Sequence, residues 1–337
     1  MKKAILAVLI PSLLGATSAF AGGVDLIKND DMTLNFNGDI DLKSYVKFKD
    51  GDSEGTQTEV IFDDIDFDFT YNINDNLKFI SGVDLTADPS SETEDKAAVG
   101  VDLIWVGFKT ANYGSLQWGN LETSFDPLGI DNAEIYTGMA SGDTDGGGTD
   151  HYNAIKYDIE FGDLWLSATY GIPGEEKANK KITQMAWKYT PGDLQVNGGF
   201  GQTTAYTGVT VESAKATYFQ AEVEYDFGDF TAAILVSQED EEIADVVTNG
   251  VEVDFTYQLT SKLKLSTGAD FLTQDIAGVT DNDDFTTMYV AGKYKFASNV
   301  SLQMEIANKQ GDLQKFNSSI DKDVDETKAG ILLNLQF

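Results

Sequence analysis

Carboxylates at every second position are the feature of the sequence that most clearly suggests a chemistry. In the stretch DDIDFDF, Asp64, Asp66 and Asp68 alternate with large apolar residues. Successive side chains of a β-strand point to opposite faces, so one face of this strand would be acidic and the other apolar. A row of carboxylates beside water attracts cations and repels anions. The stretch therefore predicts a strand with an apolar surface on one side and aqueous, cation-attracting chemistry on the other.

Other chemistries have weaker support in the sequence. His151 is the only histidine, so a Ser-His or Asp-His hydrolase would have to use it. Its neighbours Asp150 and Tyr152 suit such a site by composition alone, and we expect a strand-end residue and no enzyme. The chain has no cysteine, and we find no zinc motif, EF-hand spacing or Gly-rich phosphate loop. We therefore expect no metal and no cofactor.

The charge of the chain limits its partners. All 23 basic residues are lysine, against 56 acidic residues, and the net charge is −33. Binding to nucleic acid through phosphate neutralisation needs the opposite sign of charge. We therefore expect no nucleic-acid partner.

The first 21 residues have the pattern of a secretory signal peptide. Lys2 and Lys3 precede a short apolar run from Ala4 to Leu14, and Ala19-Phe20-Ala21 has the A-x-A form of a cleavage site. We expect cleavage after Ala21, which leaves residues 22–337 as the mature domain. No later apolar run is long enough for a transmembrane helix, and the mean hydropathy is −0.23. A membrane β-barrel gives the same low value, because its apolar residues alternate with polar ones.

Alternating segments follow one another from residue 33 to the C-terminus. We expect sixteen strands, at about residues 33–48, 58–74, 76–87, 98–110, 114–120, 151–160, 163–172, 182–190, 193–202, 216–227, 229–238, 250–259, 262–274, 284–296, 299–309 and 327–337. Tight turns alternate strictly with longer polar connections, as in outer-membrane barrels. Lipid cannot satisfy free strand edges, so the sheet must close. The predicted fold is an all-β, antiparallel, sixteen-stranded transmembrane barrel.

The apolar faces of the first five strands should point outward. We expect them to carry five large aromatic residues: Phe36, Phe67, Phe69, Trp105 and Trp118. Aromatics that precede several tight turns would form a girdle at one membrane interface.

Several short motifs, in order along the mature chain, resemble those of one family. They are LNFNG at 34–38, WVGFK at 105–109, YGSLQWG at 113–119, NAIKY at 153–157 and the terminal Phe337. The chain thereby resembles the general (non-specific) porins of Gram-negative outer membranes. The resemblance implies a homotrimer in contact with outer-membrane lipids and lipopolysaccharide. It also implies that Phe337 is read by the barrel-assembly machinery.

The resemblance further implies a third loop folded into the lumen as a constriction. Residues 121–150 form the longest connection, and Asp131 and Glu134 would be its acidic side. At three wall positions where the family typically has basic residues, this chain has Asp64, Asp102 and Asp150.

Other predicted inward residues add to the acidic wall. The predicted acids are Asp39, Asp41, Asp66, Asp68 and Asp84, against the bases Lys43, Lys47, Lys78 and Lys156. With loop and wall both acidic, we expect a pore that favours cations.

The leading hypothesis is a passive, cation-preferring diffusion channel for small hydrophilic solutes. One alternative is a channel with a preferred substrate, either an oligosaccharide or a cationic nutrient, with Trp165, Tyr45 and Tyr152 as stacking residues. A second alternative is a structural or adhesion barrel that acts through its acidic loops. Conductance in a planar bilayer separates the channel hypotheses from the structural one.

Overall fold

The computed structural model is all-β in the part of the chain that it describes. The described residues are 23–49, 52–88, 98–129, 150–173, 180–207, 211–242, 245–277, 283–313 and 321–337. The expected signal peptide, 1–21, and the expected loop residues Asp131 and Glu134 lie outside these ranges. Within them, no helix has the length and apolarity needed to cross a bilayer.

The described ranges contain seventeen strands. They are β1 (Val24–Lys28), β2 (Met32–Lys49), β3 (Asp52–Asn74), β4 (Leu77–Asp88), β5 (Ala98–Thr110), β6 (Gly114–Glu122), β7 (Asp150–Phe161), β8 (Leu164–Gly171), β9 (Lys180–Tyr189), β10 (Leu194–Thr207), β11 (Val211–Asp226), β12 (Phe230–Glu241), β13 (Val246–Thr260), β14 (Leu263–Ile276), β15 (Asp283–Ala297), β16 (Val300–Leu313) and β17 (Asp321–Gln336). Strands β2 to β17 correspond one to one to the sixteen predicted strands, with ends that differ by up to six residues.

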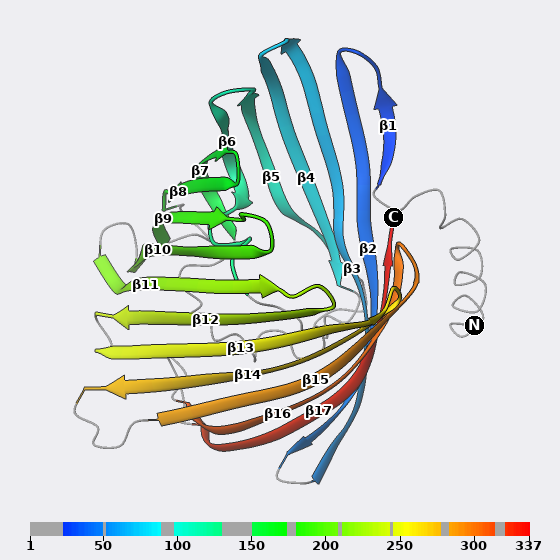
Figure 1. Cartoon of the computed structure of the whole chain (residues 1–337). Coiled ribbons are helices and arrows are strands. Elements are labelled where there is room, and N and C mark those ends of the chain that lie inside the picture. Colours follow the sequence, from blue (N-terminus) through cyan, green and yellow to red (C-terminus); the bar gives the residue numbers. More distant parts are fainter. Residues whose placement is uncertain are drawn as a thin grey trace.

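The sixteen strands β2 to β17 form a closed antiparallel barrel (Figure 1). Each strand pairs with the next along the chain, and β17 pairs with β2 from Glu326↔Lys49 to Gln336↔Asp39. Closure leaves no free edge along this ring, which is the condition for a sheet surrounded by lipid. The predicted fold class is confirmed.

The short strand β1 was not predicted. It pairs with the same edge of β2 as β17 does, one strand after the other along that edge. It pairs with β2 from Val24↔Phe36 to Lys28↔Thr33, so it occupies the part of the β2 edge that β17 does not reach. Between the two, Gly38 and Phe337 exchange backbone hydrogen bonds of 3.1 and 2.9 Å. The C-terminus therefore lies next to the start of β1, as Figure 1 shows.

Alternation explains why each strand holds its register. In β13, Val251 and Phe255 are exposed on the outer face, whereas Glu252 and Asp254 are each only 3% exposed on the inner face. A shift by one residue would place the carboxylates in lipid.

Glycine shapes the tight turns of the barrel. Gly162, Gly192 and Gly228 have φ values of 61°, 65° and 96°, in the left-handed region that other L-residues rarely adopt. Nothing lies within 4 Å of a Cβ added at any of the three, so the backbone conformation and not space requires glycine there.

Candidate functional site: an acidic concavity on the inner wall

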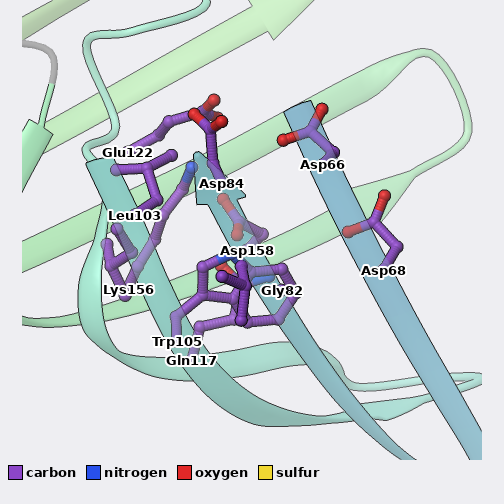
Figure 2. A pocket seen from close by; sticks show the side chains of 12 residues that line it. Asp66, Asp68, Gly82, Asp84, Leu103, Trp105, Gln117, Glu122, Lys156 and Asp158 are labelled. Atoms are coloured by element: carbon purple, nitrogen blue, oxygen red, sulfur yellow. The ribbon is translucent and has the colours of Figure 1, made fainter. Parts of the chain in front are cut away.

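A concavity of about 270 Å³ lies on the inner wall formed by β3 to β7 (Figure 2). Five carboxylates line it, from Asp66, Asp68, Asp84, Glu122 and Asp158. The one cationic side chain in this lining is that of Lys156. The remaining lining residues are Gly82, Val83, Leu103, Trp105, Gln117 and Leu121.

The strand register sets these side chains side by side. One row runs from Asp66 on β3 to Asp84 on β4 and Leu103 on β5. The next row runs from Asp68 on β3 to Gly82 on β4 and Trp105 on β5. Because residues two apart share a face, both rows point into the lumen. Asp84 is only 5% exposed.

Trp105 lies inside the barrel, so its predicted outward position was wrong. A Cβ added at Gly82 would come within 2.6 Å of the indole Nε1 and 2.7 Å of Cε2, so the ring lies directly over the β4 backbone. Gly119, in register with Trp105 on β6, also leaves its side-chain position empty. Trp118 is exposed on the outer face as predicted, and its ring centroid lies 5.8 Å from that of Phe108.

The opposite wall of the lumen also carries acids. β12 lies half-way round the ring from β4. On the neighbouring strands, Glu252 and Asp270 are cross-strand partners, and both are almost fully buried. Asn197 Nδ2 donates a 2.9 Å hydrogen bond to Glu222, and the Tyr289 hydroxyl donates one to Asp254.

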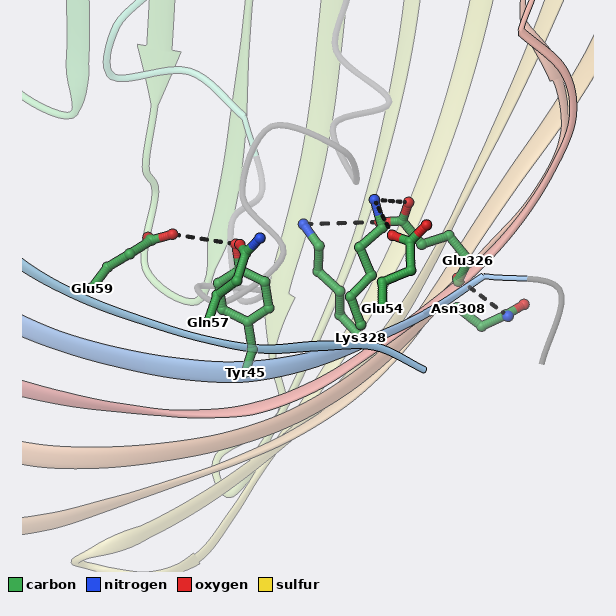
Figure 3. A network of polar contacts seen from close by, with 8 residues as sticks. Tyr45, Glu54, Gln57, Glu59, Asn308, Glu326 and Lys328 are labelled. Atoms are coloured by element: carbon green, nitrogen blue, oxygen red, sulfur yellow. Dashed lines mark hydrogen bonds and ion pairs between the residues drawn. The ribbon is translucent and has the colours of Figure 1, made fainter. Parts of the chain in front are cut away.

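Lysines lie on the inner wall where the barrel closes, among them Lys47 on β2 and Lys328 on β17, and Figure 3 shows Lys328 beside Glu54 and Glu326. Lys47 Nζ lies 2.7 Å from Glu326 and 3.3 Å from Glu54, so its charge is locally balanced. Lys328 lies 5.2 Å from the centre of the Tyr45 ring, and the Tyr45 hydroxyl donates to Gln57 and Glu59. Of these lysines, the sequence had indicated Lys47 and had given no signal for Lys328.

Asp39 and Asp41 also belong to this closing seam. Asn334 Nδ2, on β17, donates to Asp39 at 2.7 Å and to Asp41 at 2.8 Å. Both carboxylates therefore face inward, next to the last strand.

The chain that follows β6 turns onto the inner wall. Ser124 Oγ lies 2.7 Å from both Ser167 Oγ and Thr169 Oγ1 on β8. Phe125 packs edge-on against Tyr218 with ring centroids 4.9 Å apart, in an inner cluster with Leu128, Ala186 and Trp165. A Cβ added at Gly199 would come within 2.6 Å of the Phe125 ring, so this glycine makes room for it.

The remaining predicted wall residues are placed as follows. Asp102 is exposed at a register irregularity, where β4 pairs with Leu103 and then Val101, and it does not line the concavity. Asp64 lies in a similar irregularity of β3, between Asp63, which pairs with Asp39, and Asp66, which pairs with Asn37. The side chains of Asp64 and Asp150 lie outside the described part of the structure.

His151 is held by backbone groups on both ring nitrogens. Nδ1 accepts a 3.2 Å hydrogen bond from the Asn153 N–H, so Nε2 carries the proton and donates to the Lys180 carbonyl oxygen at 2.9 Å. The ring is buried and has no free nitrogen for proton transfer. In the described ranges, no group of three or more His, Cys, Asp or Glu residues could hold a metal ion.

A closed barrel with an apolar outside and a charged inner wall defines a membrane channel. The chain belongs to the Gram-negative porin family, whose model matches residues 5–314. It is therefore a channel protein of the Gram-negative outer membrane, and porins are not enzymes.

Solved porins share this fold. In-vitro folded OmpT of Vibrio cholerae has a TM-score of 0.72 at 23% identity, covering 93% of this chain and 100% of its own, and OmpT has also been solved in a trimer form. The anion-selective porin from Comamonas acidovorans has a TM-score of 0.71 at 14% identity, covering 91% of this chain and 100% of its own. Salmonella typhi OmpF in complex with daunomycin has a TM-score of 0.71 at 18% identity, covering 92% of this chain and 99% of its own. No curated protein sequence matched the chain.

Proposed function

We propose that this porin is a passive diffusion channel for small hydrophilic solutes that prefers cations. The observation that carries the proposal is the concavity of the inner wall, whose lining contains five carboxylates and one lysine. Fixed charge in a narrow aqueous pore raises the local concentration of counter-ions and excludes ions of the same sign.

The fold alone does not determine the sign of the preference. The barrel is as similar to an anion-selective porin as it is to OmpF, with a TM-score of 0.71 in each case. Ion preference must therefore come from the side chains that line the wall. The acids of β11 to β14 add to those of β3 to β7, whereas Lys47 at the closing seam is paired with Glu326 and Glu54.

The same proposal includes the processing and the constriction of the channel. Residues 1–21 would be the cleaved signal peptide and 22–337 the barrel. The connection 121–150 would be the constriction loop, with Asp131 and Glu134 on its acidic side. Its inward course is supported by Ser124 and Phe125, which contact the inner wall. Asp39, Asp64, Asp102 and Asp150 remain proposed lumen acids beside those of the concavity.

We also propose that the protein assembles as a homotrimer in outer-membrane lipid and lipopolysaccharide. Phe337 would be recognised by the barrel-assembly machinery. The trimer form of OmpT supports the homotrimer. So does a continuous row of outer rings from Phe69 through Phe79 and Phe108 to Trp118, with centroid distances of 5.8 to 6.3 Å. Such a row gives a neighbouring barrel a large aromatic surface.

The experiment is a reversal-potential measurement in a KCl gradient across a planar bilayer. The reversal potential of the unmodified channel should be shifted from zero toward the equilibrium potential of potassium. The triple variant Asp66→Asn, Asp68→Asn, Asp84→Asn should move it toward zero or toward the chloride side, because three wall charges are removed.

The matched control removes three exposed aspartates at tight turns: Asp163→Asn, Asp193→Asn, Asp229→Asn. An equal shift in both triple variants would refute the wall as the source of the preference. A protein that inserts but does not conduct would favour the structural or adhesion alternative.

A further inference from the structure

The indole of Trp105 gives the acidic concavity a flat aromatic floor that ion selection does not require. We propose that the concavity is a binding subsite for a small organic ammonium ion that carries an aromatic or other flat apolar group. The proposal rests on the proposed function and names the class of solute that this wall would retain.

The position of the indole is built into three adjacent strands. Trp105 is in register with Gly82 on one side and with Gly119 on the other. An added Cβ at Gly82 would lie 2.6 to 2.8 Å from the indole atoms Nε1, Cε2 and Cζ2. The ring can therefore lie across β4 only because position 82 has no side chain.

Carboxylates stand at the end of the indole that lies over β4. Asp68 is the next residue in the same row, and Asp66 and Asp84 form the adjacent row. Figure 2 shows the Asp66 and Asp68 side chains projecting from β3 beside the Trp105 and Gly82 pair. A ligand that covers the indole would thus place a substituent near these oxygens.

This combination matches an organic cation better than an inorganic ion or a neutral sugar. The face of an indole attracts cations and stacks with flat groups, and tryptophan is the best side chain for both. Potassium in water has no flat group to stack. A neutral sugar would stack but would not use the excess of carboxylates over the single ammonium of Lys156. The volume of about 270 Å³ suits a ligand with one small ring.

The experiment uses the folded mature protein in a planar bilayer, with phenethylammonium as the probe. Ethylammonium supplies the charge without the ring, and 2-phenylethanol supplies the ring without the charge. Phenethylammonium should reduce the potassium current at concentrations roughly tenfold lower than either control, which corresponds to about 1.4 kcal/mol.

Two variants test the indole itself. Trp105→Leu should remove the tenfold advantage. Gly82→Ala should weaken it, because the new methyl group displaces the ring from β4. Gly100→Ala is the matched control on β5, since its added Cβ would meet only Thr86 Cγ2 at 3.6 Å.

The outcomes separate this proposal from the proposed function. An unchanged advantage in Trp105→Leu would overturn the subsite, even if the channel remains cation-preferring. Equal potency of 2-phenylethanol would also overturn it, in favour of a neutral stacking solute such as a sugar. A channel that is blocked as expected but shows no cation preference would refute the proposed function and leave the subsite standing.

Discussion

At the scale of single residues, the face of the barrel wall on which a side chain lies decides whether it contacts the lumen or packs on the outer surface. Trp105 and Trp118 are close in sequence on paired strands, yet one lies over Gly82 in the lumen and the other packs beside Phe108 outside. The sequence could not separate them, because residues 103–106 are all apolar and show no alternation. The informative signal was the pair of glycines, Gly82 and Gly119, in the strands on either side. Their register with Trp105 becomes visible only in the folded barrel.

A charge placed on either face of β3 tests this assignment. Phe67 packs against Phe36 with ring centroids 5.0 Å apart, and Phe36 packs against Phe337 at 5.4 Å. Phe67→Lys should lower the free energy of unfolding by up to about 2–4 kcal/mol, the cost of a lysine on the lipid face near the bilayer midplane. Asp66→Lys, one residue away on the lumen face, should cost much less. Urea titrations in lipid vesicles measure both, and equal losses would contradict the placement of Phe67.

At the scale of elements, alternation made the sixteen barrel strands predictable. Each strand separates lipid from water, so its residue pattern has to repeat every two positions. The five-residue strand β1 was not predicted because five residues are too few to show a clear alternation of apolar and polar side chains. Its pairing with β2 also depends on where β17 ends, which the sequence does not show. The irregularities at Asp64 and Asp102 were also hidden, since a bulge changes which face a residue takes without a composition signal.

The segment after β6 should be held by the Phe125 ring. Phe125 is only 8% exposed and packs on Tyr218 and over Gly199. Removing a buried Phe side chain typically costs about 3–5 kcal/mol of local packing. Phe125→Ala should therefore loosen the connection that begins there and speed its cleavage by chymotrypsin, which acts at residues such as Tyr136. Mass spectrometry of the digests measures the rate.

The control for that digestion is Phe161→Ala. Phe161 is exposed at the β7–β8 turn, so its loss should leave the cleavage of the 121–150 connection unchanged. If Phe125→Ala digests at the unmodified rate, the inner cluster does not anchor this connection.

At the scale of the whole molecule, the barrel separates two kinds of charge along its circumference. Buried or concavity-lining carboxylates lie on the lumen faces of β3 to β7 and of β11, β13 and β14, whereas lysines where β17 meets β2 are paired with glutamates. The sequence indicated the excess of acid but not this distribution. Which strands lie opposite one another, and which lysines find a partner, depends on closure of the ring.

This distribution makes ion preference depend on salt. Lowering KCl from 0.1 M to 0.01 M lengthens the Debye length from about 10 Å to about 30 Å, so fixed charges on the wall act further into the lumen. The ratio of potassium to chloride permeability, from reversal potentials at constant gradient ratio, should therefore rise as salt falls. The rise should be smaller in the variant that lacks the Asp66, Asp68 and Asp84 charges, and unchanged in the tight-turn variant that lacks those of Asp163, Asp193 and Asp229. An equal rise in all three proteins would mean that the net charge of −33 acts from the outer surface as a whole and not from the wall.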